Sequence, residues 1–352
     1  MTDSQRIEAL LKRQKPDRVP IWPFAAQGFA VIYNNLSITD AYTNPEACYQ
    51  ALRKTCQDFG WVFFPVLGYA AMGAWEFGGD IRMPSGEYGQ APMVIRYPVE
   101  KDEDVYNLKW PGPDSGFFPT ARRFSELARQ EKLDNEPFNT TIGSLSGFDL
   151  ACNIVGVARF LKWLIKKPDL AHYLIRAITE WSLEGLADQR EKLGTDGVLC
   201  MSGGAMTSNR LISPKQFEEF ALPGISEVQT KLRTWGYKTS FVHICGEQND
   251  NLPYWSQVDF GDPAIISIGH EVKLSTAAEL FPNDIIYGNL EPALVQTGTP
   301  AEVYEATKRI VEEGKKLAGG FIFATGCDLP PRAPIENVKM MTQAVEDFGW
   351  YD

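Results

Sequence analysis

The sequence lacks a long apolar segment, an excess of basic residues and a dense set of cysteines. No apolar run approaches the roughly 18 residues that a membrane-spanning helix requires, so we expect no membrane contact. The first residues are polar and amphipathic and lack the continuous apolar region of a secretory signal, which makes the cytoplasm the expected location. The formal net charge is -11, and an acidic surface repels phosphate backbones, which argues against nucleic acid as a partner.

The six cysteines do not form the dense pattern of a disulfide-stabilised domain in a chain of 352 residues. In a reducing compartment a cysteine serves as a buried thiol, a nucleophile or a metal ligand. Four have no partner at a useful spacing and are expected to be buried apolar side chains: Cys48, Cys56, Cys152 and Cys200. Internal repeats, low-complexity tracts and flexible linkers are also missing, which favours one domain over residues 1–352.

Short apolar runs rich in β-branched and aromatic residues alternate with helical patterns along the chain. Eight runs are predicted to be strands: Val19–Phe24, Trp61–Val66, Phe138–Gly143, Asp196–Met201, Ser240–Cys245, Ala264–Gly269, Asp284–Asn289 and Phe321–Gly326. Continuous apolar runs of this kind suit strands buried on both faces, as in parallel sheets. Eight strands in one alternating series favour an α/β fold of the (β/α)8 barrel type.

One stretch in the N-terminal half interrupts this alternation. Residues 69–135 are too many for a loop and are rich in glycine and proline. Within them Ile81–Pro84 and Met93–Tyr97 flank the sequence SGEYGQAP, which predicts a β-hairpin insertion. Helices are expected elsewhere, among them Pro45–Phe59, a segment from Ser213-Pro214 to about Trp235, and one that begins at Thr299-Pro300.

Three candidate metal ligands lie at predicted strand ends. His243 and Cys245 are two residues apart, so on a strand they point to the same face, at its C-terminal end. Cys327 follows the last predicted strand, in FIFATGCDLPP. Because active sites of barrels are built at the C-terminal ends of the strands, the three side chains are predicted to converge on one rim.

An imidazole and two thiolates are a suitable ligand set for zinc, and a fourth, exchangeable position is typical of a catalytic site. Glu271, which follows the strand Ala264–Gly269, is predicted to supply a further oxygen ligand. His270 adjoins it and is a competing ligand. The alternatives are a pair of core side chains, a structural zinc site, and a zinc site that only docks a partner protein.

Several segments resemble the uroporphyrinogen decarboxylase superfamily over nearly the full length: LISPKQFEEFALPGI, VHICGE, YGNLEP, GTPAEV and FIFATGCDLPPRAPIENVKMM. The resemblance implies a (β/α)8 barrel, in agreement with the strand count. True decarboxylases of this kind hold the substrate carboxylates with an arginine-rich stretch and carry an aspartate after the second strand. Here no arginine lies between Arg18 and Arg53, and WVFFPVLGY supplies no aspartate, which argues against decarboxylase activity.

The sequence is similar to the other branch, the corrinoid-dependent methyltransferases. These carry a His-x-Cys motif and a distant Gly-Cys, here at His243, Cys245 and Cys327, and bind zinc through them. Zinc-dependent methionine synthase is similar and has an acidic ligand that falls by position on Glu271. The resemblance implies zinc-dependent methyl transfer between a small methylated substrate and the cobalt of a corrinoid. Because no Asp-x-His-x-x-Gly pattern is present, we expect a separate corrinoid protein as partner.

Two directions of transfer are open. Phe24, Phe29 and Tyr69 lie at or beyond predicted strand ends, and an aromatic wall there favours O-demethylation of a methoxylated aromatic. Glu76 is a candidate to orient such a substrate. In the alternative, a zinc-bound thiolate accepts the methyl group from methyl-cobalt.

Two polar residues near the ligands are candidates for catalytic roles. Asn289 ends the seventh predicted strand, where it either binds substrate or caps the next helix. Asp328 is next to Cys327 and is expected to orient a ligand.

Overall fold

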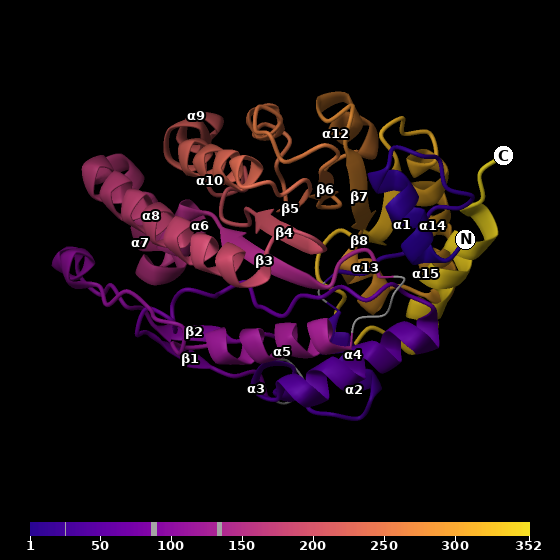
Figure 1. Cartoon of the computed structure of the whole chain (residues 1–352), viewed down its shortest axis with the longest axis horizontal. Coiled ribbons are helices and arrows are strands. Elements are labelled where there is room, and N and C mark those ends of the chain that lie inside the picture. Colours follow the sequence, from indigo (N-terminus) through magenta and orange to yellow (C-terminus); the bar gives the residue numbers. More distant parts are fainter. Residues whose placement is uncertain (25, 86–89, 132–135) are drawn as a thin grey trace.

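The computed structural model describes residues 1–24, 26–85, 90–131 and 136–352 (Figure 1). Its centre is a parallel sheet in which each strand pairs with the next along the chain. The strands are β3 Thr140–Leu145, β4 Val198–Gly203, β5 Ser240–Ile244, β6 Ile265–Ile268, β7 Ile285–Leu290 and β8 Phe321–Thr325. Six of the eight predicted strands are therefore confirmed, with β3 and β4 each beginning two residues later than expected.

The first two predicted strands are wrong as regular strands. Among the described residues of 19–24, only Ile21 forms a bridge, to Phe323 of β8, and residues 61–66 carry no strand pairing. Proline explains the difference, because Pro20, Pro23 and Pro65 have no N–H to donate to a ladder. A proline inside an apolar run argues against a regular strand, but the prediction gave more weight to the apolar pattern.

Both segments nevertheless complete the barrel through their side chains. The Trp22 indole stacks on Phe64 with 4.6 Å between ring centroids, and its Nε1 donates to the carbonyl of Phe63 at 3.3 Å. Alternate residues of both segments join those of the strands in one interior cluster: Trp22, Phe24, Val62, Phe64, Phe138, Leu199, Phe241, Ile265, Ile285, Tyr287, Ile322 and Ala324. The fold is a (β/α)8 barrel, as the sequence predicted.

Helices surround the sheet and close its N-terminal end (Figure 1). Helix α1, Asp3–Leu11, contributes Ile7 and Leu10 to the interior cluster and so covers the bottom of the barrel. The helices between and after the strands are α4 Pro45–Phe59, α5 Phe118–Gln130, α8 Pro168–Leu193, α10 Leu222–Thr234, α11 Leu252–Trp255, α12 Leu274–Leu280, α14 Pro300–Gly314 and α15 Ile335–Phe348. The remaining helices are α2 Gln27–Tyr33, α3 Asp40–Thr43, α6 Gly147–Val155, α7 Val157–Lys166, α9 Pro214–Gln216 and α13 Pro292–Thr297.

Helix starts follow the capping chemistry of the sequence. Ser213 and Thr299 each accept from the backbone N–H three residues later, with Gln216 and Glu302 closing the capping boxes. The helix expected from Ser213 to Trp235 is interrupted, because Phe217–Ala221 forms a π-turn between α9 and α10. The structure describes no helix that is long and apolar enough to span a membrane.

The predicted hairpin insertion is present. Strand β1, Asp80–Arg82, pairs antiparallel with β2, Met93–Arg96, and the 3-10 turn Asp102–Asn107 follows. The residues that connect the two strands, 86–89, and residues 132–135 near the end of the predicted insertion lie outside the described residues. Within the same range α5 packs on α4 and β3, so it is a helix of the barrel rather than a part of the inserted hairpin.

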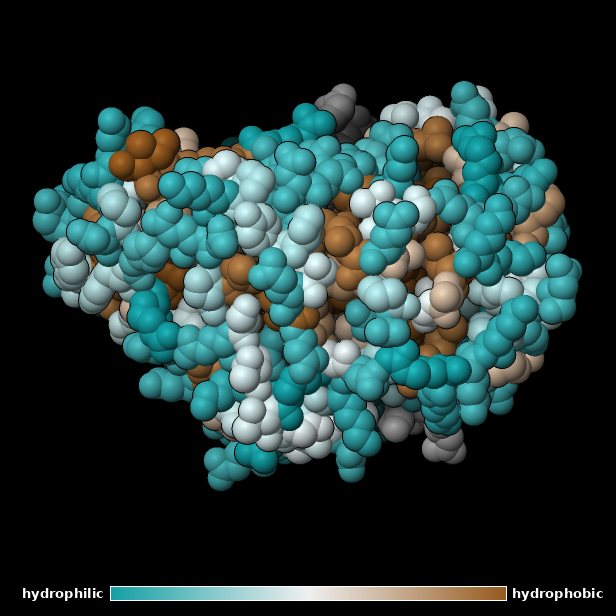
Figure 2. Space-filling view, turned by 90° about the horizontal axis from the view of Figure 1, so that it is seen from above, coloured by the Kyte–Doolittle hydropathy of each residue, from teal (hydrophilic) through white to brown (hydrophobic). Residues whose placement is uncertain are grey.

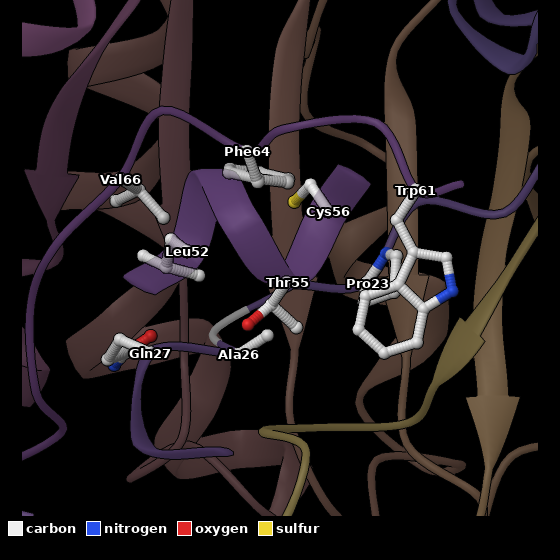
Figure 3. A pocket seen from close by; sticks show the side chains of 9 residues that line it. All are labelled: Pro23, Ala26, Gln27, Leu52, Thr55, Cys56, Trp61, Phe64 and Val66. Carbon is white, nitrogen blue, oxygen red and sulfur yellow. The ribbon is translucent and has the colours of Figure 1, made fainter. Parts of the chain in front are cut away.

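A small cavity lies between α4 and the two extended segments (Figure 3). It is lined by Pro23, Ala26, Gln27, Leu52, Thr55, Cys56, Trp61, Phe64 and Val66. Its volume is about 10 Å³, which is room for a single water molecule. It is a gap in packing where regular strand pairing is missing, and it is too small for a substrate.

Candidate metal centre and active site

The strand β5 presents two of the candidate ligands at the C-terminal end of the barrel. His243 is its fourth residue, between Gly203 of β4 and Ser267 of β6, and Cys245 directly follows the strand. Residues two apart on a strand share a face, so both side chains point to the same side. Gly203 allows the close approach, because a Cβ there would lie 2.8 Å from the carbonyl oxygen of His243.

The third ligand arrives from the other end of the sheet. Cys327 follows β8 and is preceded by Gly326, where a Cβ would lie 2.9 Å from the backbone nitrogen of His270. The curved sheet β5-β6-β7-β8 brings the C-terminal ends of β5 and β8 to the same rim, although 82 residues separate the two cysteines in the chain. The ligand atoms of His243, Cys245 and Cys327 all lie within 4.8 Å of one another, so the predicted convergence is present.

The geometry of these three side chains fits a zinc ion. The sulfurs of Cys245 and Cys327 are 3.7 Å apart, far longer than a disulfide. Two thiolates on one tetrahedral zinc, with bonds of about 2.3 Å, have sulfurs separated by about 3.8 Å. The Nε2 of His243 is inaccessible to solvent and has no hydrogen-bond partner among the described residues. A buried ring nitrogen without a hydrogen-bond partner, beside two thiols, is the kind of ligand set that binds a metal cation.

A serine on the neighbouring strand orients the imidazole. The Nδ1 of His243 lies 2.9 Å from the hydroxyl oxygen of Ser267, which is completely buried in β6. When Nδ1–H donates to this oxygen, the lone pair of Nε2 is directed at the sulfurs. Ligating histidines are commonly fixed in this way.

Proton sharing in the cluster favours negative charge on the sulfur of Cys245, while the bond that Cys327 donates to Cys245 raises the pKa of Cys327. A hydrogen bond from Cys327 lowers the pKa of Cys245, against burial, which raises it. Burial alone would lower the pKa of His243, but the neighbouring Cys327 and Asp328 outweigh it and the pKa is raised. Burial raises the pKa of Asp328 to about 6. A divalent cation bound by these groups would take the place of the shared protons.

Glu271, predicted as a fourth ligand, lies in the loop after β6. Its Oε2 is 3.4 Å from Nδ1 of His270, whose Nε2 in turn is 3.8 Å from Oε1 of Glu291. Of the described residues, the compact ligand group includes His243, Cys245 and Cys327 but not Glu271. Its role as a ligand therefore stays a prediction.

The two predicted catalytic residues differ in their surroundings. Asn289 in β7 is buried, and its amide nitrogen donates to the carbonyls of Gly269 at 3.1 Å and Val272 at 2.8 Å. It thus fixes the loop that carries Glu271. Asp328 is solvent-exposed yet surrounded by protein atoms, as a side chain in a recess is, and it acts electrostatically on His243. A catalytic role for either residue stays a prediction.

Of the predicted substrate residues, Phe24 lies beside the metal ligands. Its ring centroid is 5.0 Å from that of His243. Phe29 instead lies in α2, where it stacks on Tyr33 of the same helix with a centroid distance of 5.8 Å and contacts Phe59 of α4 at 6.0 Å. Phe24 therefore contributes an apolar wall to the site, and Phe29 is part of the packing between helices.

Tyr69 and Glu76 form a buried anchor in the insertion. The Tyr69 hydroxyl donates to Oε1 of Glu76 at 3.2 Å. The same carboxylate accepts from the backbone nitrogens of Gly73 at 2.6 Å and Phe117 at 3.0 Å. These bonds fold the insertion onto itself, which is the role their contacts support.

Three polar residues that position the site were missed by the sequence analysis. They are Ser267, the buried Gln248 after β5, and Asp149 of α6, whose carboxylate accepts from the backbone nitrogens of Ala205 at 2.8 Å and Met206 at 2.9 Å. A serine inside the apolar run IISIG is a weak signal. Nothing in the sequence singles out the other two, because their partners lie on other loops.

The chain belongs to the uroporphyrinogen decarboxylase family, whose model matches residues 2–348. It is 26% identical to the methylcobamide:CoM methyltransferase MtbA of Methanosarcina acetivorans, over 99% of each chain. It is 22% identical to a uroporphyrinogen decarboxylase of Anaeromyxobacter dehalogenans, also over 99% of each chain. A solved methyltransferase from Methanosarcina mazei has the same fold, with a TM-score of 0.79, 22% identity and 99% of both chains covered.

These similarities confirm the predicted family and its corrinoid methyltransferase branch. A second such relative, MtaA of Methanosarcina barkeri, is 24% identical over 97% of each chain. The chain is accordingly an enzyme of the corrinoid-dependent methyltransferase class.

Proposed function

We propose that this enzyme uses a zinc ion at His243, Cys245 and Cys327 to move a methyl group between a small substrate and the cobalt of a separate corrinoid protein. The convergence of these three ligand atoms at the C-terminal end of the barrel carries the proposal. A site with three protein ligands leaves a position for substrate, which distinguishes a catalytic from a structural zinc site.

When bound, zinc supplies a coordination site that lowers the pKa of a thiol or polarises an ether oxygen of the substrate. Residues of the chain orient the ligands, moderate the charge of the ion and exclude water. Ser267 keeps the imidazole of His243 in one orientation. The two thiolates moderate the positive charge of the ion, so that a coordinated thiolate stays nucleophilic. Phe24 limits water beside the ligands, since its ring packs against His243.

A thiol is the methyl acceptor that we favour. MtbA and MtaA are named for methyl transfer from a methylcobamide to CoM, and a further relative from Methanosarcina mazei, 25% identical over 57% of this chain, for methylated thiols. The ligand set points the same way, because two thiolates temper Lewis acidity. In this direction the thiol loses its proton on binding, and its sulfur takes the methyl group from methyl-cobalt.

O-demethylation of a methoxylated aromatic is the second candidate. Phe24 supports it, because an aromatic ring 5.0 Å from the imidazole offers a surface for a flat substrate. Fewer of the predicted substrate residues support O-demethylation than the sequence analysis expected. Phe29, Tyr69 and Glu76 already have packing or hydrogen-bond partners within the protein.

The test begins with metal content. Wild type, Cys245→Ala and Cys327→Ala are compared with Cys200→Ala, which removes a completely buried thiol of β4. We expect about one zinc per chain in wild type and Cys200→Ala and its loss in the other two. A wild-type protein without zinc, even after zinc is supplied, would refute the proposal.

Substrate class is decided next by absorption spectroscopy of a corrinoid protein. Loss of the methyl-cobalt spectrum on addition of a thiol supports the thiol direction. Formation of methyl-cobalt from cobalt(I) and a methoxylated aromatic supports the second candidate. Failure of the zinc-loaded enzyme in both assays would refute methyl transfer to or from these two classes.

A further inference from the structure

Gln248 is a completely buried glutamine three residues after Cys245. Its amide nitrogen lies 3.2 Å from the carbonyl oxygen of Cys245. The same nitrogen is 3.1 Å from the carbonyl oxygen of Gly204 and 3.1 Å from the hydroxyl of Thr207, both in the loop after β4. The side chain therefore joins the loops that follow two neighbouring strands, with one contact on the backbone of a metal ligand.

The orientation of this amide is fixed from its other side. The indole Nε1 of Trp255, itself fully buried, donates to Oε1 of Gln248 at 3.3 Å. Because an indole N–H only donates, the oxygen must face Trp255 and the nitrogen must face the three acceptors. Glutamate cannot replace glutamine here, since a carboxylate oxygen would then face those oxygens without a proton between them.

His243, the other candidate ligand from β5, is connected to the same hydrogen-bond network through Gly204. The backbone nitrogen of Gly204 donates to the carbonyl oxygen of His243 at 3.1 Å, while the carbonyl of Gly204 accepts from Gln248. The loop has no slack at this point, because a Cβ on Gly204 would lie 2.5 Å from Thr207 Oγ1. Gln248 thus links the backbone at His243 with the backbone at Cys245.

We propose that Gln248 is a positioning residue of the metal centre, which holds Cys245 at a fixed place relative to His243. The inference rests on the proposed zinc site and adds a residue that does not touch the metal. The physical reason is that three ligands bind an ion tightly only when their relative positions are fixed before it arrives. Removing a residue that orients ligands typically costs about 10- to 100-fold in metal affinity.

The test uses Gln248→Met, which keeps the volume and loses all four hydrogen bonds, and Gln248→Glu. Gln257→Met is the matched control, because Gln257 is exposed and, among the described residues, its amide donates to the carbonyl of Pro253 alone. Zinc affinity is measured by competition with a chromogenic chelator. The ligand geometry is read independently from the visible spectrum of the cobalt(II)-substituted protein.

We expect Gln248→Met to bind zinc about 10- to 100-fold more weakly, with a shifted or broadened cobalt(II) spectrum, and Gln248→Glu to be at least as affected. Gln257→Met should match wild type. Unchanged zinc affinity and an unchanged cobalt(II) spectrum in Gln248→Met would overturn the inference while leaving the proposed function intact. A wild type that binds neither metal would overturn both.

Trp255→Phe provides a second variant in case the glutamine variants do not fold. It removes the indole N–H that fixes the amide, together with part of a buried ring, and it leaves the three bonds donated by Gln248 in place. We therefore expect a smaller loss of zinc affinity with the same direction of spectral change. If Trp255→Phe folds and neither affinity nor spectrum changes, the amide orientation has no part in positioning Cys245.

Discussion

Tyr287→Phe tests how the irregular first segment is held in the barrel. Tyr287 is completely buried in β7, and its hydroxyl donates to the carbonyl oxygen of Trp22. The segment has few other backbone bonds to the sheet, namely Trp22 to Phe323 at 3.1 Å and Phe323 to Pro20 at 2.9 Å. The hydroxyl therefore gives the buried carbonyl of Trp22 a donor and ties the first segment to β7.

The expected cost follows from what the substitution leaves behind. Phenylalanine fills nearly the same space, so no cavity is added, but the carbonyl of Trp22 stays buried without its partner. A buried acceptor left without a partner costs about 1–3 kcal/mol. We expect the free energy of unfolding to fall by that amount, with the largest increase in hydrogen exchange in the first segment.

Urea denaturation followed by fluorescence measures the change, and Tyr237→Phe is the control. Tyr237 is also a buried ring, but its hydroxyl donates to the carbonyl of Gly194 at 3.2 Å in a partly exposed position. Water can satisfy that carbonyl in the variant, so its effect should be smaller. Equal stability losses in the two variants, or none in Tyr287→Phe, would refute this account of barrel closure.

Three further predictions concern the candidate metal site and the ion pair between Arg6 of α1 and Asp17. Ser267→Ala should weaken zinc binding about 10- to 100-fold, measured by chelator competition, because the His243 ring loses its 2.9 Å partner; wild-type affinity would contradict this. Asn289→Ala should lower the free energy of unfolding by about 1–3 kcal/mol in urea titrations and leave the zinc content intact; inactivation without destabilisation would instead indicate catalysis. The Arg6 guanidinium holds the pKa of Asp17 well below its usual range. Asp17 therefore stabilises the fold above its ordinary pKa and loses this contribution as pH falls through the lowered value. Asp17→Asn should reduce the dependence of the melting temperature on pH in the acid range. The effect should stay below about 1 kcal/mol, because Asp17 is partly exposed to solvent.

The barrel was predictable because its signal is local. Strands β4 to β8 are largely apolar runs, β3 is rich in β-branched residues, and helices such as α14 begin at capping boxes that can be read from the sequence. The first two predicted strands are wrong because their apolar content is typical of strands, whereas their prolines lack the backbone N–H groups that strand pairing requires. Residues 19–24 and 61–66 are buried like strands, but their prolines cannot pair like strands.

The convergence of the three candidate metal ligands was predictable for a similar reason. Strand periodicity places His243 and Cys245 on one face, and the C-terminal ends of all parallel strands in a barrel, β5 and β8 included, lie on one rim. The aromatic residues were harder, because a large ring at a strand end is equally suited to a pocket wall and to packing. Only the contacts separate Phe24, beside the imidazole, from Phe29, among the helices.

By itself the sequence determined the barrel, its hairpin insertion, the family and the three convergent ligands, because each depends on spacing along one element or on a motif. The tertiary structure alone decided which polar side chains hold those ligands in place. Ser267 and Gln248 act through partners on other loops or strands. A hydrogen bond between elements depends on distances of a few ångströms that the periodicity of either element leaves open.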